Sequence, residues 1–128
     1  MGFLPNKTPH ATTKRIGDAA EDEALQYLQA HGLRLLVRNY RTPGRGGGEI
    51  DLIMQDQDST VVFVEVRKRT STRHGGAAAS VGRVKQRRIV FAAQFYLLKL
   101  RTLPPCRFDV VEVTPAGLAW LQAAFDAS

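Results

Sequence analysis

Residues 48–53 read Gly-Glu-Ile-Asp-Leu-Ile, and residues 61–68 read Val-Val-Phe-Val-Glu-Val-Arg-Lys. Both stretches are dominated by aliphatic and β-branched residues, which favours β-strands. The polar residues 55–59 between them predict a turn, so the two strands are expected to form a hairpin. Each strand carries carboxylates among core residues, where charged side chains are rare unless they are paired or bind a metal.

Alternation along these strands gives each acid a face. Because successive side chains of a strand point to opposite sides, Glu49 and Asp51 are expected to share one face of their strand, and Glu65 and Arg67 to share one face of theirs. The hairpin should then bring Asp51 and Glu65 together with a cation beside them. Carboxylates and a nearby backbone carbonyl are the oxygen ligands that Mg²⁺ or Mn²⁺ prefers, and such an ion can hold a phosphate. The predicted metal ligands are therefore Asp51 and Glu65.

The length and composition are those of one folded domain. The chain has 128 residues, of which 44% are hydrophobic and 23% charged. Residues 1–11 contain two prolines and no periodic pattern, which predicts a flexible N-terminal arm before a single domain over residues 12–128. The sequence shows neither a signal-peptide core nor a stretch that could span a membrane, so we expect a cytoplasmic protein without a membrane partner. The single cysteine, Cys106, excludes an internal disulfide and is expected in a strand.

Hydrophobic periodicity predicts an α/β fold with a mixed central sheet flanked by helices. A helix is expected from residue 12 or 13 to residue 31, and a strand over residues 33–40. After the 49–68 hairpin, a second helix capped by Ser80 is expected to end near residue 100, with Val84 among its buried residues. Strands follow at residues 106–113 and, at the sheet edge, 118–121. The unbroken apolar run at residues 61–64 predicts that its strand is central.

The charge distribution is uneven. The formal net charge is +6, and no acid occurs between Glu65 and Asp109. A basic surface beside acids fits a metal-dependent enzyme acting on nucleic acid, although a solvated helix face explains the charges equally well. The candidate nucleic-acid contacts are Lys68, Arg69, Arg73, Lys85 and Arg88.

Several short motifs occur in a fixed order along residues 14–125. They are Gly17-Asp18-Ala19-Ala20-Glu21, Arg38-Asn39-Tyr40-Arg41, the 48–53 stretch, Phe63-Val64-Glu65-Val66, Lys85, and Arg107-Phe108-Asp109-Val110-Val111. In this order and spacing the chain resembles the YraN-like uncharacterised protein family. The strand acids are similar to the PD-(D/E)XK motif of the restriction-endonuclease-like superfamily.

That resemblance implies a restriction-endonuclease-like core of order αβββαβ, with Asp51 and Glu65 as metal ligands. It also implies that Glu21 is an additional carboxylate of the kind found in resolvase-like nucleases, and Glu49 is a further candidate on the predicted Asp51 face. The implied substrates are DNA or RNA. The expected function is a metal-dependent nuclease-like protein, such as a Mg-dependent endonuclease or a resolvase-like nuclease.

One position departs from the motif. The pattern Glu-Val-Lys is replaced by Glu65-Val66-Arg67. Arginine keeps its proton and cannot act as a base, but it can clamp a phosphate or stabilise developing charge. Lys68 should point to the opposite face unless the strand ends or bulges there.

This departure leaves two alternatives: a catalytically impaired nucleic-acid-binding module, or a protein-interaction domain on a nuclease scaffold. The oligomeric state also stays open, with a dimer among the alternatives.

Structural roles remain open for the same residues. Asp51 and Glu65 could form ion pairs with Arg67 or Lys85 in a buried network. Glu21 has a simpler role as a solvated acid early in a helix. The glycine-rich loop at residues 44–48 lacks the Gly-Lys-Ser/Thr order of a P-loop, so it is read as a flexible connection whose backbone could approach a phosphate.

Overall fold

The computed structural model describes residues 13–70 and 81–127. Within these ranges, two helices and five strands follow one another as α1 (Thr13–Ala30), β1 (Arg34–Arg41), β2 (Glu49–Gln55), β3 (Val61–Lys68), α2 (Arg83–Leu97), β4 (Cys106–Thr114) and β5 (Gly117–Phe125). The N-terminal arm predicted at residues 1–11 and the predicted nucleic-acid contact Arg73 lie outside the described residues. No helix among the described residues is long and apolar enough to cross a membrane.

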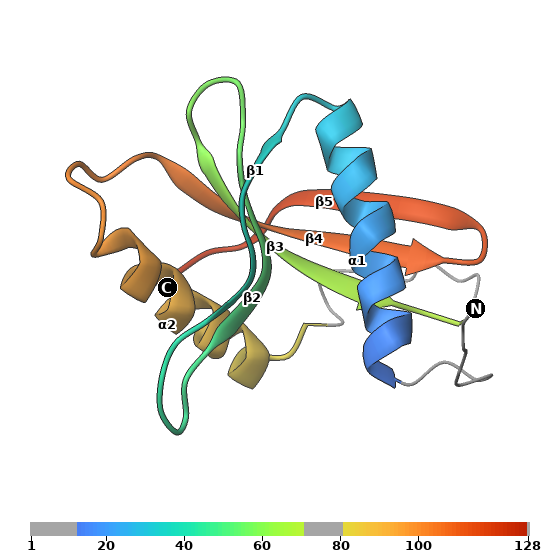
Figure 1. Cartoon of the computed structure of the whole chain (residues 1–128), viewed down its shortest axis with the longest axis horizontal. Helices are drawn as coiled ribbons and strands as arrows, with labels where there is room; N and C mark the ends of the chain where they lie inside the picture. The colour runs from blue at the N-terminus through green and yellow to red at the C-terminus, as the bar shows by residue number, and fades with distance from the viewer. Residues whose placement is uncertain (1–12, 71–80, 128) are drawn as a thin grey trace, which may run out of the picture.

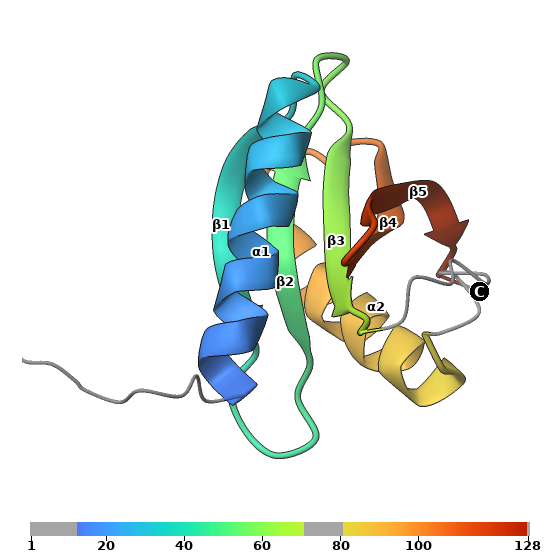
Figure 2. The same cartoon turned by 90° about the vertical axis from the view of Figure 1, so that its right-hand side faces the viewer.

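The sheet has the strand order β1-β2-β3-β4-β5. Neighbouring strands are antiparallel except β3 and β4, which are parallel because the chain crosses over between them through α2. The helices cover opposite faces, α1 on one side and α2 on the other (Figures 1 and 2). The predicted mixed α/β fold is confirmed, and β3 is the central strand as its unbroken apolar run indicated.

Each face of the sheet has its own hydrophobic core. Ala20, Ala24 and Leu28, spaced by four residues on α1, pack over Val62 and Val64 of β3. The alternate residues of β3 point the other way: Val61 and Phe63 pack with residues of α2, among them Ile89, Ala92 and Ala93. The central strand is therefore buried on both sides, which explains why its sequence does not alternate between apolar and polar residues.

The second helix differs from its prediction. It begins at Arg83 with Gly82 as its N-cap, and not with Ser80. Val84, expected in the core, is 60% exposed. The buried residues follow the spacing 89, 92 and 93 along one side, and Val84 projects away from that side because it lies five residues before Ile89 at 100° per residue. β5 is also longer than the predicted edge strand, and Cys106 begins β4 as expected but is exposed.

The sheet opens between β2 and β3 at one end. Their pairing runs from Gln55 with Val61 only as far as Leu52 with Val64. Beyond that rung β2 stays paired with β1 as far as Glu49, and β3 stays paired with β4 as far as Lys68. The two halves of the sheet thus diverge, and Figure 1 shows the ribbons separating. We call the space beyond the Leu52–Val64 rung the fork.

Side-chain alternation is interrupted on both strands that form one side of the fork. Ile50 packs in the α2-face core and Leu52 in the α1-face core, although residues two apart in a regular strand share a face. On β1, the residue beside this irregularity is Asn39, whose φ is 55° in the left-handed region that asparagine tolerates. The prediction that Glu49 and Asp51 share one face assumed regular alternation, and that assumption is wrong at this point.

Candidate functional site

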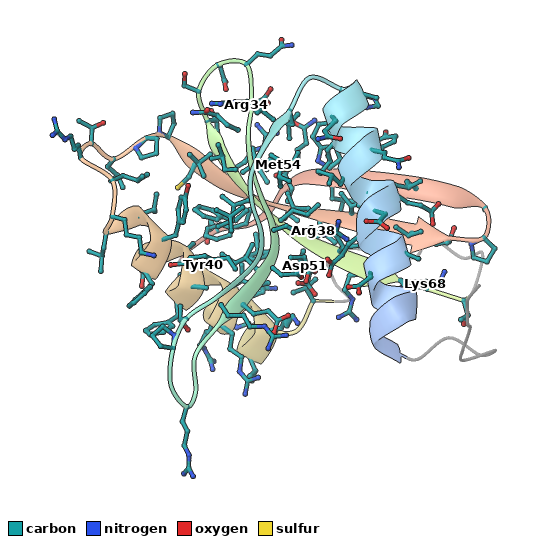
Figure 3. All side chains as sticks on the ribbon, viewed as in Figure 1. Arg34, Arg38, Tyr40, Asp51, Met54 and Lys68 are labelled. Carbon is teal, nitrogen blue, oxygen red and sulfur yellow. The ribbon has the colours of Figure 1, made fainter. Side chains whose placement is uncertain are left out.

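Asp51 projects into the fork. Its Oδ2 accepts a hydrogen bond of 2.8 Å from the backbone N–H of Val66. Because β2 no longer pairs with β3 there, the carboxylate occupies the place that a backbone carbonyl would take in a continued ladder. Figure 3 shows Asp51 near the middle of the molecule, where the ribbons of β2 and β3 part. The interruption in β2 therefore places this acid between the two strands.

Glu65 is the buried partner of Asp51. The residue is only 4% exposed, and its Oε2 lies 3.6 Å from Nζ of Lys85 on α2. Its other oxygen, Oε1, is buried and has no hydrogen-bond partner among the described residues. A buried carboxylate oxygen without a donor is costly, so a ligand that supplies positive charge would stabilise this atom.

The two carboxyl groups influence each other. Burial, and next the negative charge of Glu65, raise the pKa of Asp51 to about 7. Burial also raises the pKa of Glu65, while the positive charges of Lys85 and Arg67 oppose that rise. The structure therefore brings together the two acids that the sequence selected. It also contains one ion pair of the buried network that the sequence left open, because Lys85 is an ion-pair partner of Glu65.

Glu21 approaches the fork from α1. Its Oε1 lies 3.4 Å from Nε of Arg38, which also forms a 2.8 Å ion pair with Asp22 and donates to the carbonyl oxygen of Asp18. Burial, and next the negative charge of Asp51, raise the pKa of the Glu21 carboxyl, while Arg38 opposes that rise. Glu21 is thus held on the α1 side of the fork within the electrostatic reach of Asp51.

The residues after Glu65 have different surroundings. Arg67 is half-buried, and Lys68 is exposed farther along β3 (Figure 3). No register shift occurs between β3 and β4 up to Lys68, so its side chain lies on the face opposite Glu65, as alternation predicts. Arg69 does not extend freely into solvent, because its Nε lies 2.6 Å from Oε2 of the fully buried Glu112.

Glu49 lies apart from the carboxyl pair, in a polar hollow of about 270 Å³ on the α2 side. Its Oε1 is 3.8 Å from Nε of Arg41. The predicted nucleic-acid contacts Lys85 and Arg88 line the same hollow, together with Thr42 and glycines of the 44–48 loop. Lys85 therefore borders both the hollow and Glu65.

Sequence reasoning missed two parts of this arrangement. The sequence marks Arg38 only as part of the motif at residues 38–41. Its position in a strand gives no sign that its side chain orients Glu21. Arg41 and Thr42 were not selected as site residues. The only signal for them was their position next to a glycine-rich loop, since glycines often occur where a backbone approaches another group closely.

Comparison with known proteins places the chain in a family. The model described as Uncharacterised protein family UPF0102 matches residues 20–113. The chain belongs to this family. The UPF0102 protein of Albidiferax ferrireducens is 64% identical over 127 residues, with 99% of each chain covered. That of Paracidovorax citrulli is 61% identical over 134 residues, again with 99% of each chain covered. The YraN-like family resemblance is thereby confirmed.

The part matched by the UPF0102 model includes all the fork residues, from Glu21 to Lys85. Among solved structures, the UPF0102 chain aligns with SSO0001 at a TM-score of 0.47 and 12% identity, over 92% of this chain and 55% of that one.

Proposed function

We propose that this UPF0102 chain is a metal-dependent nuclease-like protein with a restriction-endonuclease-like core, acting on phosphodiesters of DNA or RNA. The observation that carries the proposal is the buried Glu65, whose Oε1 has no hydrogen-bond partner among the described residues, beside Asp51 in the fork. A cationic helix borders the pair. Phosphodiester hydrolysis needs relief of negative charge and an activated water, and paired carboxylates that hold a hard cation supply both.

The donor set suits Mg²⁺ or Mn²⁺. Both carboxyl groups present oxygen, and their raised pKa values reflect burial and, for Asp51, a neighbouring negative charge that a cation would offset. No group of three His, Cys, Asp or Glu side chains that could hold a metal occurs among residues 13–70 and 81–127. Mg²⁺ needs no such cage, because it commonly keeps several waters and binds through one or two carboxylates plus substrate phosphate.

The roles follow from position. Asp51 and Glu65 would hold the ion, which when bound supplies an activated water and neutralises charge on the phosphate. The motif lysine of β3 is replaced by Arg67. Lys85 on α2, whose Nζ lies 3.6 Å from Oε2 of Glu65, would provide an ammonium group to the site instead. Arg67 can clamp a phosphate with its guanidinium group. Glu21, oriented by Arg38, would act as a further carboxylate on the α1 side.

A nucleic-acid-binding module with impaired catalysis is the second candidate. Arg67 favours it, because arginine cannot accept the proton that a motif lysine can exchange. This candidate predicts salt-dependent binding of nucleic acid that persists in EDTA without any product.

Cleavage assays with a matched pair of variants test the proposal. Single-stranded, duplex and branched substrates would be incubated with Mg²⁺, with Mn²⁺ or with EDTA. Asp51→Asn should abolish metal-dependent cleavage, whereas Asp58→Asn, on the exposed hairpin turn, should retain it. Equal cleavage by both variants would show that the activity does not come from the fork.

The Arg67→Lys variant distinguishes the nuclease from the binding module. Restoring the motif should raise cleavage if the strand position limits the reaction. Lys85→Gln should lower cleavage in the wild-type background if α2 supplies the ammonium group. If wild type, Arg67→Lys and Lys85→Gln all form no product while binding in EDTA persists, the chain is a binding module.

A further inference from the structure

We infer that the hollow between α2 and the loop of residues 42–48 binds a phosphate group of a nucleic-acid strand, next to the phosphate that reaches Asp51 and Glu65. The inference rests on the proposed function in taking nucleic acid as the partner. It goes beyond that function by assigning a second binding site to residues outside the carboxyl pair.

The charges around the hollow favour an anion. Among the described residues of the lining, Arg41 at the end of β1 and Lys85 and Arg88 on α2 contribute three cations, against one carboxylate from Glu49. Glu49 is itself only loosely paired, at 3.8 Å from Arg41. Arg88 is exposed and has no ion-pair partner among the described residues, so its guanidinium group is free to meet a phosphate.

The walls of the hollow are fixed to each other. Gly48 N–H donates to Oγ1 of Thr42 at 2.7 Å, and Thr42 N–H donates to the carbonyl of Gly48 at 3.0 Å, which closes the base of the loop. Gly48 also lies against α2 so closely that a Cβ there would be 1.9 Å from the carbonyl oxygen of Arg88. The base of the loop is therefore packed against α2, and groups that are held in place before binding lose less entropy when they bind a ligand.

The described lining offers no aromatic face on which a base could stack. Its side chains are charged or hydroxyl-bearing, and the other described residues of the lining are glycines. Cationic side chains of this kind bind backbone phosphates, and phosphate contacts carry no sequence information. Binding in the hollow is therefore expected to depend on the backbone charge and not on base stacking.

Lys85 links the two sites. Its Nζ is 3.6 Å from Oε2 of Glu65, and the same side chain lines the hollow. A strand with one phosphate in the hollow would thus pass directly alongside the fork. This geometry makes the hollow a positioning site for the strand that is cleaved.

α2 itself offers a matched control. Arg87 immediately precedes Arg88 on this helix and is also exposed, but it lines a different hollow with Phe91 and Gln94. Arg87→Gln and Arg88→Gln remove the same charge from the same helix. Only the second substitution removes a group from the proposed phosphate site.

The experiment measures fluorescence anisotropy of a labelled single-stranded 12-mer in EDTA over a range of salt concentrations. Arg88→Gln and Arg41→Gln should each weaken binding by about tenfold, the scale of one lost charged contact, and each should reduce the salt slope by about one. Arg87→Gln should weaken binding less than threefold, roughly what loss of general charge gives. The double variant should weaken binding by less than the product of the single effects, since both arginines contact one phosphate.

The arms of the experiment identify the source of the phosphate. The affinity of a 12-mer with a 5′-phosphate is compared with that of one without it. If the 5′-phosphate raises the affinity and Arg88→Gln removes this increase, the hollow binds a terminal phosphate monoester. If both 12-mers bind equally, the hollow binds an internal phosphodiester. Abasic 12-mers should bind as well as the parent. Equal losses for Arg87→Gln and Arg88→Gln would overturn the inference, as would methylphosphonate strands that bind undiminished.

Different results would contradict the nuclease proposal and the phosphate site. If Asp51→Asn leaves cleavage unchanged while Arg88→Gln still weakens binding selectively, the nuclease proposal falls and the phosphate site stands. If Asp51→Asn abolishes cleavage and the two arginine variants behave alike, the phosphate site falls and the nuclease proposal stands.

Discussion

Asp51 has a structural contact as well as a proposed chemical one. Its carboxylate replaces a missing backbone partner of Val66, so it helps to join β2 and β3 where their ladder has ended. At the same time its pKa is raised, which means that the folded chain tolerates its charge poorly. Asparagine is the informative replacement, because its amide oxygen can still accept the Val66 hydrogen bond while the charge is lost.

The raised pKa of Asp51 predicts how stability depends on pH. The pKa rises from 3.8 to about 7, so between these values the folded chain binds a proton that the unfolded chain has released. The free energy of unfolding of the metal-free protein should therefore fall as the pH rises from about 4 to about 7. Asparagine does not titrate, so Asp51→Asn removes this loss. The free energy of unfolding of the variant minus that of wild type should therefore increase by about 2 kcal/mol as the pH rises from 5 to 8.

Urea denaturation in EDTA at pH 5 and pH 8 measures this difference. Asp58→Asn is the control, because hydrogen bonds from Thr60 lower the pKa of Asp58 and leave it ionised at both pH values. A wild-type to Asp51→Asn difference that is the same at both pH values would contradict the raised pKa.

The proximity of Asp51 and Glu65 could be predicted because a hairpin is local: the turn and the apolar runs fix which strands pair. The contact from Val66 and the orientation of Glu21 by Arg38 could not be predicted. They depend on where the ladder between β2 and β3 ends and on the positive φ of Asn39. Neither feature can be seen in the periodicity of the residues, because an asparagine in a strand can adopt either the extended or the left-handed backbone conformation.

At the scale of elements, the site depends on how the 42–48 loop meets α2. The helix begins later than its sequence suggested, at Arg83, because Gly82 and not Ser80 caps it. Its buried side is set by contact with the sheet through Ile89, Ala92 and Ala93. Propensity alone could not show this, since the helix has apolar residues on several sides. Lys85 and Arg88 face the loop as a result.

The close approach of Gly48 to α2 predicts a severe effect of a single methyl group. Gly48→Ala should lower the free energy of unfolding by about 1–3 kcal/mol, because the backbone of Arg88 must move to admit the Cβ. Gly82→Ala is the matched control, since a Cβ at Gly82 meets nothing within 4 Å and its φ is −68°. It should cost less than about 1 kcal/mol.

Chemical denaturation of both variants, followed by the anisotropy assay, checks this prediction. Gly48→Ala should also weaken binding of the 12-mer, since the loop and α2 form the two walls of one hollow. Equal stability of the two glycine variants would show that the loop yields easily to the added methyl group.

At the scale of the whole molecule, the two acids of the fork lie inside a largely basic surrounding. The carboxylates of Asp51 and Glu65 are enclosed in the fork, while cations of β3 and α2 remain exposed around it. The sequence showed these cations as a long stretch without acids, but it could not show which of them point toward the site. Arg69 illustrates the difficulty, because its ion pair with the buried Glu112 engages a cation that appeared free in the sequence.

Position in the molecule should therefore decide which cations matter for binding. Lys68 and Arg34 are both exposed, but Lys68 lies beyond the fork and Arg34 begins β1 at the other end of the sheet (Figure 3). Lys68→Gln should reduce the salt slope for nucleic-acid binding by about one, and Arg34→Gln should leave it unchanged. Titrations at several salt concentrations measure both slopes. Equal slopes for the two variants would mean that binding follows net charge alone.

The solvent-facing thiol at the beginning of β4 has a practical consequence. Cys106 is the only cysteine of the chain and pairs across the sheet with Val61, four residues before Glu65. At a rise of about 3.3 Å per residue, this sulfur lies roughly 13 Å from the carboxylate along the strand direction. A maleimide dye would therefore attach at one defined point, near enough to sense a passing polynucleotide and too far away to obstruct it.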